Sequence, residues 1–185
     1  MTSLPSDVQT LCTYELDSSL NLLSVDDGWD VFAVRNGAPE LVRSRVVGQS
    51  VLASIADPTT AELYVELFRR VGTRGVPVTI PFRCDSPTVR RFLTLTIEPS
   101  PAGFRMTSTV VRTESRPLQS LLWPAHTDGQ HSVQMCSWCK RVEAAGSWLE
   151  VEEAAASLDT DASPVLRHAI CDQCRNEMAR FVEAS

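Results

Sequence analysis

The stretch VPVTIPFRCDSPTVRRFLTLTIEPSPAGFRMTSTVV, residues 76–111, decides the fold. Apolar residues occupy alternate positions over residues 76–84 and 91–98, and the alternation is less regular over residues 104–111. A period of two is typical of strands that bury one face. Turn-forming residues, Asp-Ser-Pro and Pro-Ser-Pro-Ala-Gly, separate the three segments. Three consecutive strands with short turns predict an antiparallel meander.

Two further strands and a helix are expected before this stretch. Residues 12–17 and 20–25 have the character of strands joined by a turn at Asp-Ser-Ser. Trp29, Phe32 and Ala33 have the i, i+3, i+4 spacing of one apolar helical face. This helix is expected to end at the following Asn-Gly pair, a common C-terminal signal.

A longer helix is expected after the short apolar stretch at residues 46–55. Asp57 and Pro58 supply an N-cap and a first helical residue. Apolar residues at helical spacing follow, and the helix is expected to end near residues 72–75. The order of elements over residues 11–112 is therefore β-β-α-α-α-β-β-β, which predicts an α+β fold.

The chain changes character after residue 112. Residues 113–134 are polar and rich in turn-forming residues, and they are predicted to form a linker. Residues 135–185 hold four of the six cysteines. Within them, the Gly-Ser-Trp segment at 146–148 could close a small hairpin, and residues 150–158 and 172–181 could form helices. The expected organisation is thus one domain at residues 11–112, a linker, and a small module at residues 135–185.

The first region resembles a PAS domain. The resemblance covers residues 11–112 and depends on the order of elements, on the helix at Trp29 and on the Val-Gly-Gln-Ser segment at residues 47–50. It implies a five-stranded antiparallel sheet with helices on one face. It also implies a domain that senses a small molecule or mediates protein contacts.

The C-terminal region resembles a cysteine-rich module found after sensory domains in bacterial signalling proteins. The similar segments are CSWCKRV at residues 136–142, GSW at 146–148 and HAICDQC at 168–174. The family tends to have glycine after the histidine of the last segment, where this chain has Ala169. The resemblance implies a small zinc-knuckle module attached to a sensory domain.

Two C-x-x-C motifs predict a metal site made by Cys136, Cys139, Cys171 and Cys174. Each motif directs two thiolates at one centre, and two motifs complete a tetrahedron with sulfur–metal distances of about 2.3 Å. In a reducing compartment such thiols bind metals more often than they form disulfides. Zinc is the expected metal. Four thiolates leave no open position for water, so the zinc would be structural and not catalytic.

The cysteines leave alternatives open. A dithiol redox pair, an iron–sulfur cluster and four idle buried cysteines are the other interpretations. His168, three residues before Cys171, could replace one thiolate or donate a hydrogen bond to a sulfur. Trp138 and Trp148 are expected to cover the site. Lys140 and Arg141 could offset the negative charge of a four-thiolate zinc centre.

The PAS-like region offers few cofactor ligands. Residues 1–125 contain no histidine, which excludes a histidine-ligated haem in this region. A flavin-reactive PAS domain needs a cysteine within residues 46–60, and none is present. Cys12 and Cys84 are expected to be small buried residues on strands. A non-covalent small ligand and an empty, well-packed core both remain open.

Charge and motifs exclude several function classes. The chain carries 17 basic and 23 acidic residues, a net charge of −6, so nucleic acid is a disfavoured partner. It has neither a signal peptide nor an apolar run of about 20 residues, so a cytoplasmic protein that crosses no membrane is expected. No phosphate loop, dinucleotide fingerprint or nucleophile elbow is present, and we expect no enzyme.

These observations predict a non-catalytic bacterial signalling protein. Its PAS-like domain would bind a ligand or a protein partner, and a homodimer is one such partner. The alternative is a redox sensor in which thiol oxidation releases zinc and unfolds the tail. Arg83, Arg90 and Arg91 flank the turn at residues 85–87 and could form an anion site or a partner contact, although a solvated turn is the simpler interpretation.

Overall fold

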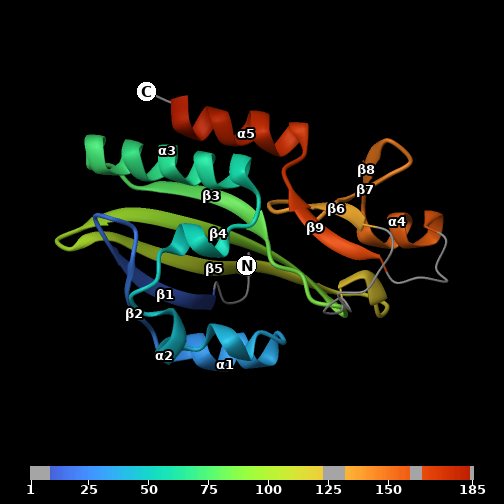
Figure 1. The fold of residues 1–185 in the computed structure, drawn as a ribbon, viewed down its shortest axis with the longest axis horizontal. Coiled ribbons are helices and arrows are strands. Elements are labelled where there is room, and N and C mark those ends of the chain that lie inside the picture. The colour runs from blue at the N-terminus through green and yellow to red at the C-terminus, as the bar shows by residue number, and fades with distance from the viewer. Residues whose placement is uncertain (1–8, 123–131, 159–163, 184–185) are drawn as a thin grey trace, which may run out of the picture.

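The computed structural model describes residues 9–122, 132–158 and 164–183. Its main feature is a five-stranded antiparallel sheet with the strand order β2-β1-β5-β4-β3 (Figure 1). The α+β class and the five-stranded antiparallel sheet predicted from sequence are confirmed. The strands are β1 (Gln9–Asp17), β2 (Leu22–Val25), β3 (Val78–Arg83), β4 (Val89–Ser100) and β5 (Gly103–Ser115).

The register of the sheet explains the alternation in the sequence. Val78 pairs with Ile97, which pairs with Met106, and all three are buried on one face. The row beside it consists of Thr79, Thr96 and Thr107 of the same strands and Thr13 of β1. Successive side chains of a strand point to opposite faces, so one face of the sheet forms the core and the other presents threonines.

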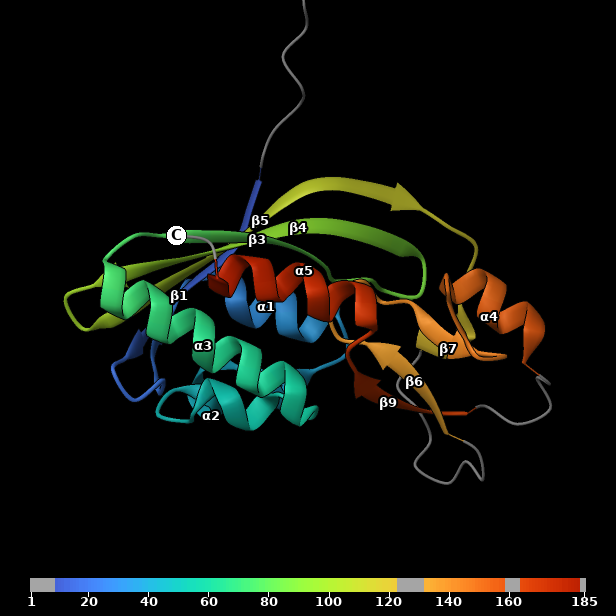
Figure 2. The same ribbon diagram turned by 90° about the horizontal axis from the view of Figure 1, so that it is seen from above.

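Three helices cover the apolar face of the sheet. They are α1 (Gly28–Arg35), α2 (Arg43–Val46) and α3 (Pro58–Arg74), with short 3-10 turns at Pro39–Leu41 and Val51–Ser54. Figure 2 shows them on the same side of the sheet. The predicted helix at Trp29 is confirmed, as is its end at the Asn-Gly pair.

Helix α3 begins and ends where the sequence predicts. The backbone N–H of Thr60 donates to the carboxylate of Asp57 at 2.8 Å, which satisfies one of the unpaired donors of the first turn. The helix ends at Gly75, whose φ of 67° is a left-handed conformation that glycine adopts without steric cost. Leu67 and Val71 are buried against the sheet.

The tail contains a second, four-stranded sheet in the order β8-β7-β6-β9. Its hairpin turns at Ala145 and Gly146, whose φ values of 51° and 74° are those of a tight turn with both central residues left-handed. The predicted hairpin and the two predicted helices of the tail are confirmed. The elements are β6 (Ser132–Cys136), β7 (Val142–Ala144), β8 (Ser147–Leu149), α4 (Val151–Ser157), β9 (Val165–Ala169) and α5 (Asp172–Glu183).

The tail shares its core with the first sheet. Helix α5 lies beside α3 in both views (Figures 1 and 2), and an arginine of α3, Arg70, donates to the carbonyl of Phe181. Met178 of α5 is 1% exposed and belongs to the same buried cluster as Ile97 and Leu67. Because α5 covers the edge of the sheet near β3, much of the tail's burial depends on the first region.

The expected three-part division of the chain stays a prediction. Strand β5 continues to Ser115 and a 3-10 turn follows at Ser120–Leu122, so part of the expected linker is ordered. The rest of that segment, residues 123–131, lies outside the described residues. Among the helices that the structure describes, none is both long enough and apolar enough to cross a lipid bilayer.

Candidate metal centre and adjoining cavity

Parallel pairing of two tail strands brings the C-x-x-C motifs together. Strands β6 and β9 run parallel with Cys136 opposite Ala169, and the N–H of Ser137 donates to the carbonyl of Ala169 at 2.8 Å. The carboxyl ends of parallel strands meet at the same edge of a sheet. Cys136 ends β6, and Cys171 follows β9, so both motifs start at that edge. Cys174 then lies in the first turn of α5.

The first motif forms a tight turn. The N–H of Lys140 donates to the carbonyl of Cys136 at 3.1 Å, and the N–H of Cys136 donates to the carbonyl of Arg141 at 2.8 Å. Lys140 has a φ of 60°, a left-handed conformation that is uncommon for a residue with a side chain. The turn directs Cys136 and Cys139 to the same point.

The four sulfurs fit one tetrahedral metal ion. They all lie within 4.8 Å of one another, and the sulfurs of Cys139 and Cys171 are 3.8 Å apart. A tetrahedron with bonds of about 2.3 Å has edges of about 3.8 Å. Cys136, Cys171 and Cys174 are buried and Cys139 is half-buried. The predicted ligands therefore come together, and the space between them is the size of one ion.

Backbone donors surround these sulfurs. The N–H of Cys171 points to the sulfur of Cys136 at 3.5 Å, and the N–H of Cys174 points to that of Cys171 at 3.4 Å. Such bonds stabilise thiolates and orient them toward a metal. The N-terminal end of α5 also favours negative charge at Cys174.

The thiols oppose one another's ionisation when no cation lies between them. Hydrogen bonds from the thiols of Cys139 and Cys174 lower the pKa of Cys136. The bonds that Cys174 donates to Cys136 and Cys139 raise its own pKa. One thiolate can thus be held by its protonated neighbours, and a bound cation is what lets the other thiols ionise.

His168 is not part of this set. The group of close ligand atoms that the described residues form consists of the four cysteine sulfurs. His168 lies on β9, exposed, and lines a second cavity. Trp138, between the two cysteines of the first motif, is buried as expected, and Trp148 packs against the same cluster.

The side chains of Arg83, Arg90 and Arg91, near residues 85–87, are paired with other protein groups and do not belong to a solvated turn. The side chain of Asp85 is fully buried, and its carboxylate pairs with Arg83 at 2.5 Å and with Arg116 at 3.2 Å. Arg83 also pairs with Glu150 at 2.8 Å, just before α4. Arg90 pairs with carboxylates of β5 and α4, and Arg91 donates to Asn36 and to the carbonyl of Cys84. These contacts show that the solvated-turn interpretation is wrong. The sequence could not indicate this, because the carboxylates of the tail that pair with these arginines are distant from the turn along the chain.

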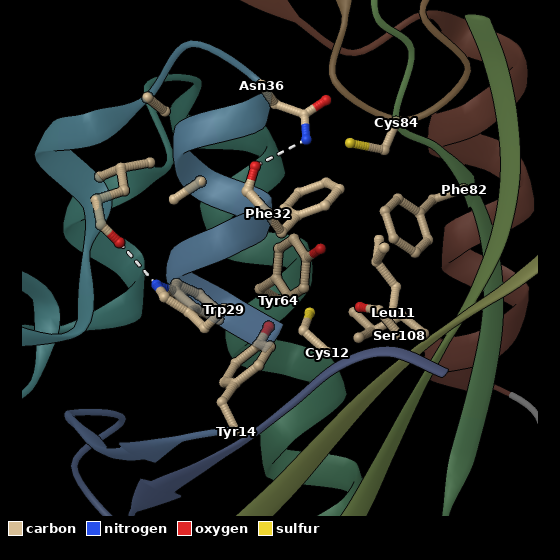
Figure 3. A pocket seen from close by; sticks show the side chains of 14 residues that line it. Leu11, Cys12, Tyr14, Trp29, Phe32, Asn36, Tyr64, Phe82, Cys84 and Ser108 are labelled. Carbon is tan, nitrogen blue, oxygen red and sulfur yellow. Dashed lines mark hydrogen bonds between the residues drawn. The ribbon is translucent and has the colours of Figure 1, made fainter. Parts of the chain in front are cut away.

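An apolar cavity of about 250 Å³ lies between the sheet and α1. Figure 3 shows aromatic rings converging on it from α1, α3 and the sheet. Trp29 is held at its rim by a 2.6 Å hydrogen bond from the indole N–H to the carbonyl of Leu41. Among the residues that the structure describes, no charged side chain lines the cavity. The lining is Leu11, Cys12, Tyr14, Trp29, Phe32, Ala33, Asn36, Ala38, Leu41, Tyr64, Phe82, Cys84, Leu95 and Ser108.

Both cysteines of the first region face this cavity. Burial raises the pKa of Cys12 to about 11, in spite of a hydrogen bond with Ser108. Burial also raises the pKa of Cys84. The expectation of a small buried residue on a strand is confirmed for Cys12 but not for Cys84, which is half-buried and follows the end of β3. At neutral pH both are neutral thiols. They offer the cavity polarisable, uncharged contacts.

Aromatic contacts join the cavity to the metal centre. Tyr64 of α3 lines the cavity, and its ring lies 5.1 Å from that of Trp138. The indole N–H of Trp138 donates to the carbonyl of Pro81 at 2.9 Å, and its carbonyl accepts from the N–H of Arg83 at 2.8 Å. Trp138, within the first C-x-x-C motif, is thus hydrogen-bonded to the edge strand β3 by both its backbone and its side chain. Tyr64 was not recognisable from the sequence as a cavity residue, because its helical spacing marks a buried face and not a cavity wall.

No protein-family model matches the chain, and no curated protein matches it. Among solved structures, a domain of an HTR-like protein from Haloarcula marismortui is similar to it, with 19% identity and a TM-score of 0.38. The similarity covers 55% of this chain and 97% of that domain. This likeness is too distant to carry a conclusion about what the chain binds.

Proposed function

We propose that this chain is a non-catalytic signalling protein of bacterial type. Its first region is PAS-like and binds a small, neutral, largely apolar ligand in the cavity beside α1. Its tail holds one structural zinc ion on Cys136, Cys139, Cys171 and Cys174. The output is contact with a protein partner, which includes a second copy of the chain, and not a chemical reaction.

The observation that carries this proposal is the contact between the cavity and the cysteine motif. Tyr64 lines the cavity on one side and packs against Trp138 on the other. Aromatic walls without charged groups favour an apolar ligand, because burying such surface is the main driving force for small-ligand binding. A ligand that moved Tyr64 would displace the ring of Trp138, and with it the turn that holds Cys136 and Cys139.

The order of elements supports the PAS-like assignment. When the short 3-10 turns are set aside, the first region has two strands, three helices and three strands, the order on which the resemblance depends. The helices cover one face of the sheet (Figure 2), and the cavity lies between that face and α1.

The close spacing of the sulfurs supports a single ion over a cluster. An iron–sulfur cluster places several irons and sulfides between its thiolates, which holds the cysteine sulfurs further apart than 3.8 Å. Three of the four sulfurs belong to buried residues, which leaves little access for water. A closed four-thiolate site is typical of structural zinc.

Binding of the neutral dye N-phenyl-1-naphthylamine tests the ligand site. We expect the full chain to bind the dye with saturation, and Ser108→Phe, which fills the cavity, to abolish binding. Thr109→Phe is the matched control, because the next residue of β5 lies on the outer face of the sheet. Equal dye binding by the two variants would refute the proposed ligand site.

Elemental analysis of the purified chain tests the metal. We expect one zinc per chain and no visible absorbance. Iron with visible absorbance would replace zinc in the proposal, and absence of any metal from protein prepared without chelators would refute the metal site.

A thiol redox sensor is the second candidate. Cys139 is half-buried and its sulfur lies 3.8 Å from that of Cys171, so peroxide can reach one thiolate and a second is close enough to attack. Peroxide takes two electrons from the two thiols, which form a disulfide while the peroxide becomes two waters. Zinc released by one equivalent of peroxide and rebound after reduction would favour this candidate; a tail inert to peroxide would exclude it.

A further inference from the structure

A second cavity, of about 200 Å³, lies where the tail meets the first region. One wall is the segment before α3 and the first turns of that helix. The opposite wall is the turn of the first C-x-x-C motif, and β9 contributes one residue. The lining combines hydroxyl, cationic and apolar groups, and the six that matter here are Ser54, Ala56, Phe82, Trp138, Lys140 and His168.

Lys140 gives this cavity its charge. Its ammonium donates to the carbonyl of Ser137 at 2.8 Å, which uses one of its three N–H groups. Within the described part of the chain no carboxylate forms an ion pair with it. Lys140 has a φ of 60°, a left-handed conformation that glycine adopts at a lower conformational cost. The turn itself therefore does not require a lysine at this position.

Two buried or half-buried carboxylates near the cavity are engaged elsewhere. Asp57 accepts hydrogen bonds from the N–H of Thr60 at 2.8 Å and from its hydroxyl at 2.6 Å. Asp85 is held between Arg83 and Arg116. In the described part of the chain the ammonium of Lys140 therefore has no carboxylate as an ion-pair partner. It also interacts electrostatically with the sulfurs of Cys136 and Cys139, so an anion that enters the cavity would share the ammonium with the metal centre.

The other half of the lining is apolar. Trp138 and Phe82 present rings, and Trp138 is fixed by the bond from its indole to Pro81. A single ammonium suits one negative charge better than the several charges of a phosphate ester, which would need more donors. The volume is below the range of about 300 Å³ and more that drug-sized ligands occupy.

We propose that this cavity binds a small organic carboxylate, with its charged end on Lys140 and its apolar body against Trp138 and Phe82. The site is separate from the neutral-ligand cavity, although Tyr64 and Phe82 form part of both walls. Its ligand would bridge the segment before α3 and the metal-binding turn.

Titration of the full, metal-containing chain with benzoate tests the site, by calorimetry or by tryptophan fluorescence. We expect saturable binding of benzoate, and binding at least about tenfold weaker for neutral benzamide and for inorganic phosphate. Equal affinity for benzoate and benzamide would overturn the proposal, because the ammonium would then contribute nothing. No binding of benzoate at millimolar concentration would overturn it as well.

Substitutions at two positions, Lys140 and Ala56, assign the binding to this cavity. Lys140→Gly removes the ammonium and suits the left-handed backbone, so we expect normal metal content and at least about tenfold weaker benzoate binding. Lys140→Arg should retain binding, and Arg141→Ala, whose side chain instead contacts Glu150 and Gln173, is the matched control.

A substitution at Ala56 tests the cavity without changing the metal-binding turn. Ala56→Phe narrows the cavity from the side of α3, so it should weaken benzoate binding while the metal content stays at the wild-type value. If Lys140→Gly lost its metal, Ala56→Phe would still decide the question. Wild-type affinity for benzoate in Ala56→Phe would overturn the proposal.

Discussion

The two sheets of this molecule hold their cores by different means. The five-stranded sheet buries long apolar side chains from every strand against α1 and α3. The four-stranded sheet of the tail has a separate cluster of six buried residues, namely Leu121, Met135, Val142, Ala144, Val151 and Ala154. Small cores stabilise little on their own. The comparison teaches that the first region has the larger apolar core, to which tail residues such as Met178 and Trp138 also contribute, whereas the tail's own cluster is small. We therefore expect the tail to depend on the cysteine centre and on its contacts with the first region.

Those contacts are of three kinds. Trp138 forms a backbone and a side-chain hydrogen bond with the edge strand β3. Helix α5 buries Met178 beside α3. Asp85 and its arginines lie between the turn of β3–β4 and the start of α4. Each of the predictions below removes a ligand, an ion pair or a cap from one region and asks which region responds.

The largest effect is expected from removal of a cysteine ligand. Cys171→Ser should lose the metal, and with it on the order of 10 kcal/mol of the free energy that structural zinc supplies to a small module. We expect hydrogen exchange to become fast in β6–β9 and to stay slow in β1, β4 and β5. Elemental analysis and exchange mass spectrometry measure both results.

The cysteines of the first region supply the control. Cys12→Ser and Cys84→Ser should keep one metal per chain, because neither sulfur belongs to the four-cysteine group. If Cys171→Ser unfolded the whole chain, the two regions would be one cooperative unit and the comparison would fail.

The next largest effect is expected at Asp85. Asp85→Ala leaves the buried guanidinium groups of Arg83 and Arg116 without their shared carboxylate, and breaking a buried ion pair costs about 3–5 kcal/mol. Urea unfolding of the metal-loaded protein measures the loss. Asp172→Ala is the matched control, because its pair with Arg175 is largely exposed and should change stability by less than about 0.5 kcal/mol.

A smaller effect is expected from the cap of α3. Asp57→Ala removes the acceptor for the N–H of Thr60, which costs about 1 kcal/mol. This loss should lower the thermal midpoint of the first region and leave the metal content unchanged. Asp57→Asn, which retains a capping oxygen, should recover most of the stability; metal loss in Asp57→Ala would show that the first region controls the centre.

The smallest effect is expected from pH at Glu150. Burial opposes ionisation of Glu150, but the hydrogen bond and charge of Arg83 prevail and hold its pKa below the ordinary value of 4.5. A depressed pKa in the folded state stabilises the protein above pH 4.5 and loses that contribution as the pH falls through the folded pKa. The stability difference between wild type and Glu150→Gln, under about 1 kcal/mol at pH 7, should therefore shrink below pH 4.5.

Parallel acid titrations of the two metal-loaded proteins measure this difference, because the metal's own pH dependence is common to both and cancels. A difference that grew as the pH fell would contradict the assigned direction of the pKa shift. A constant difference would mean that Glu150 acts only through its position before α4.

Local pattern was enough to predict most elements. Period-two alternation predicted β3 and β4, Asp57 and Gly75 bounded α3, and the tail hairpin followed from Gly146. These signals depend on residues close in the sequence, where backbone preference and burial of one face act together. The pair of C-x-x-C motifs likewise predicted four cysteines around one point.

Only the tertiary structure decided which distant groups meet. The sequence by itself determined the α+β class, the strands of the meander and the candidate metal ligands, because each is a local pattern of side chains. It did not determine that Asp85 meets Arg116, that Tyr64 meets Trp138, or that Lys140 borders a cavity with residues before α3. Such contacts depend on how whole elements pack, and packing is a property of the complete core rather than of any segment.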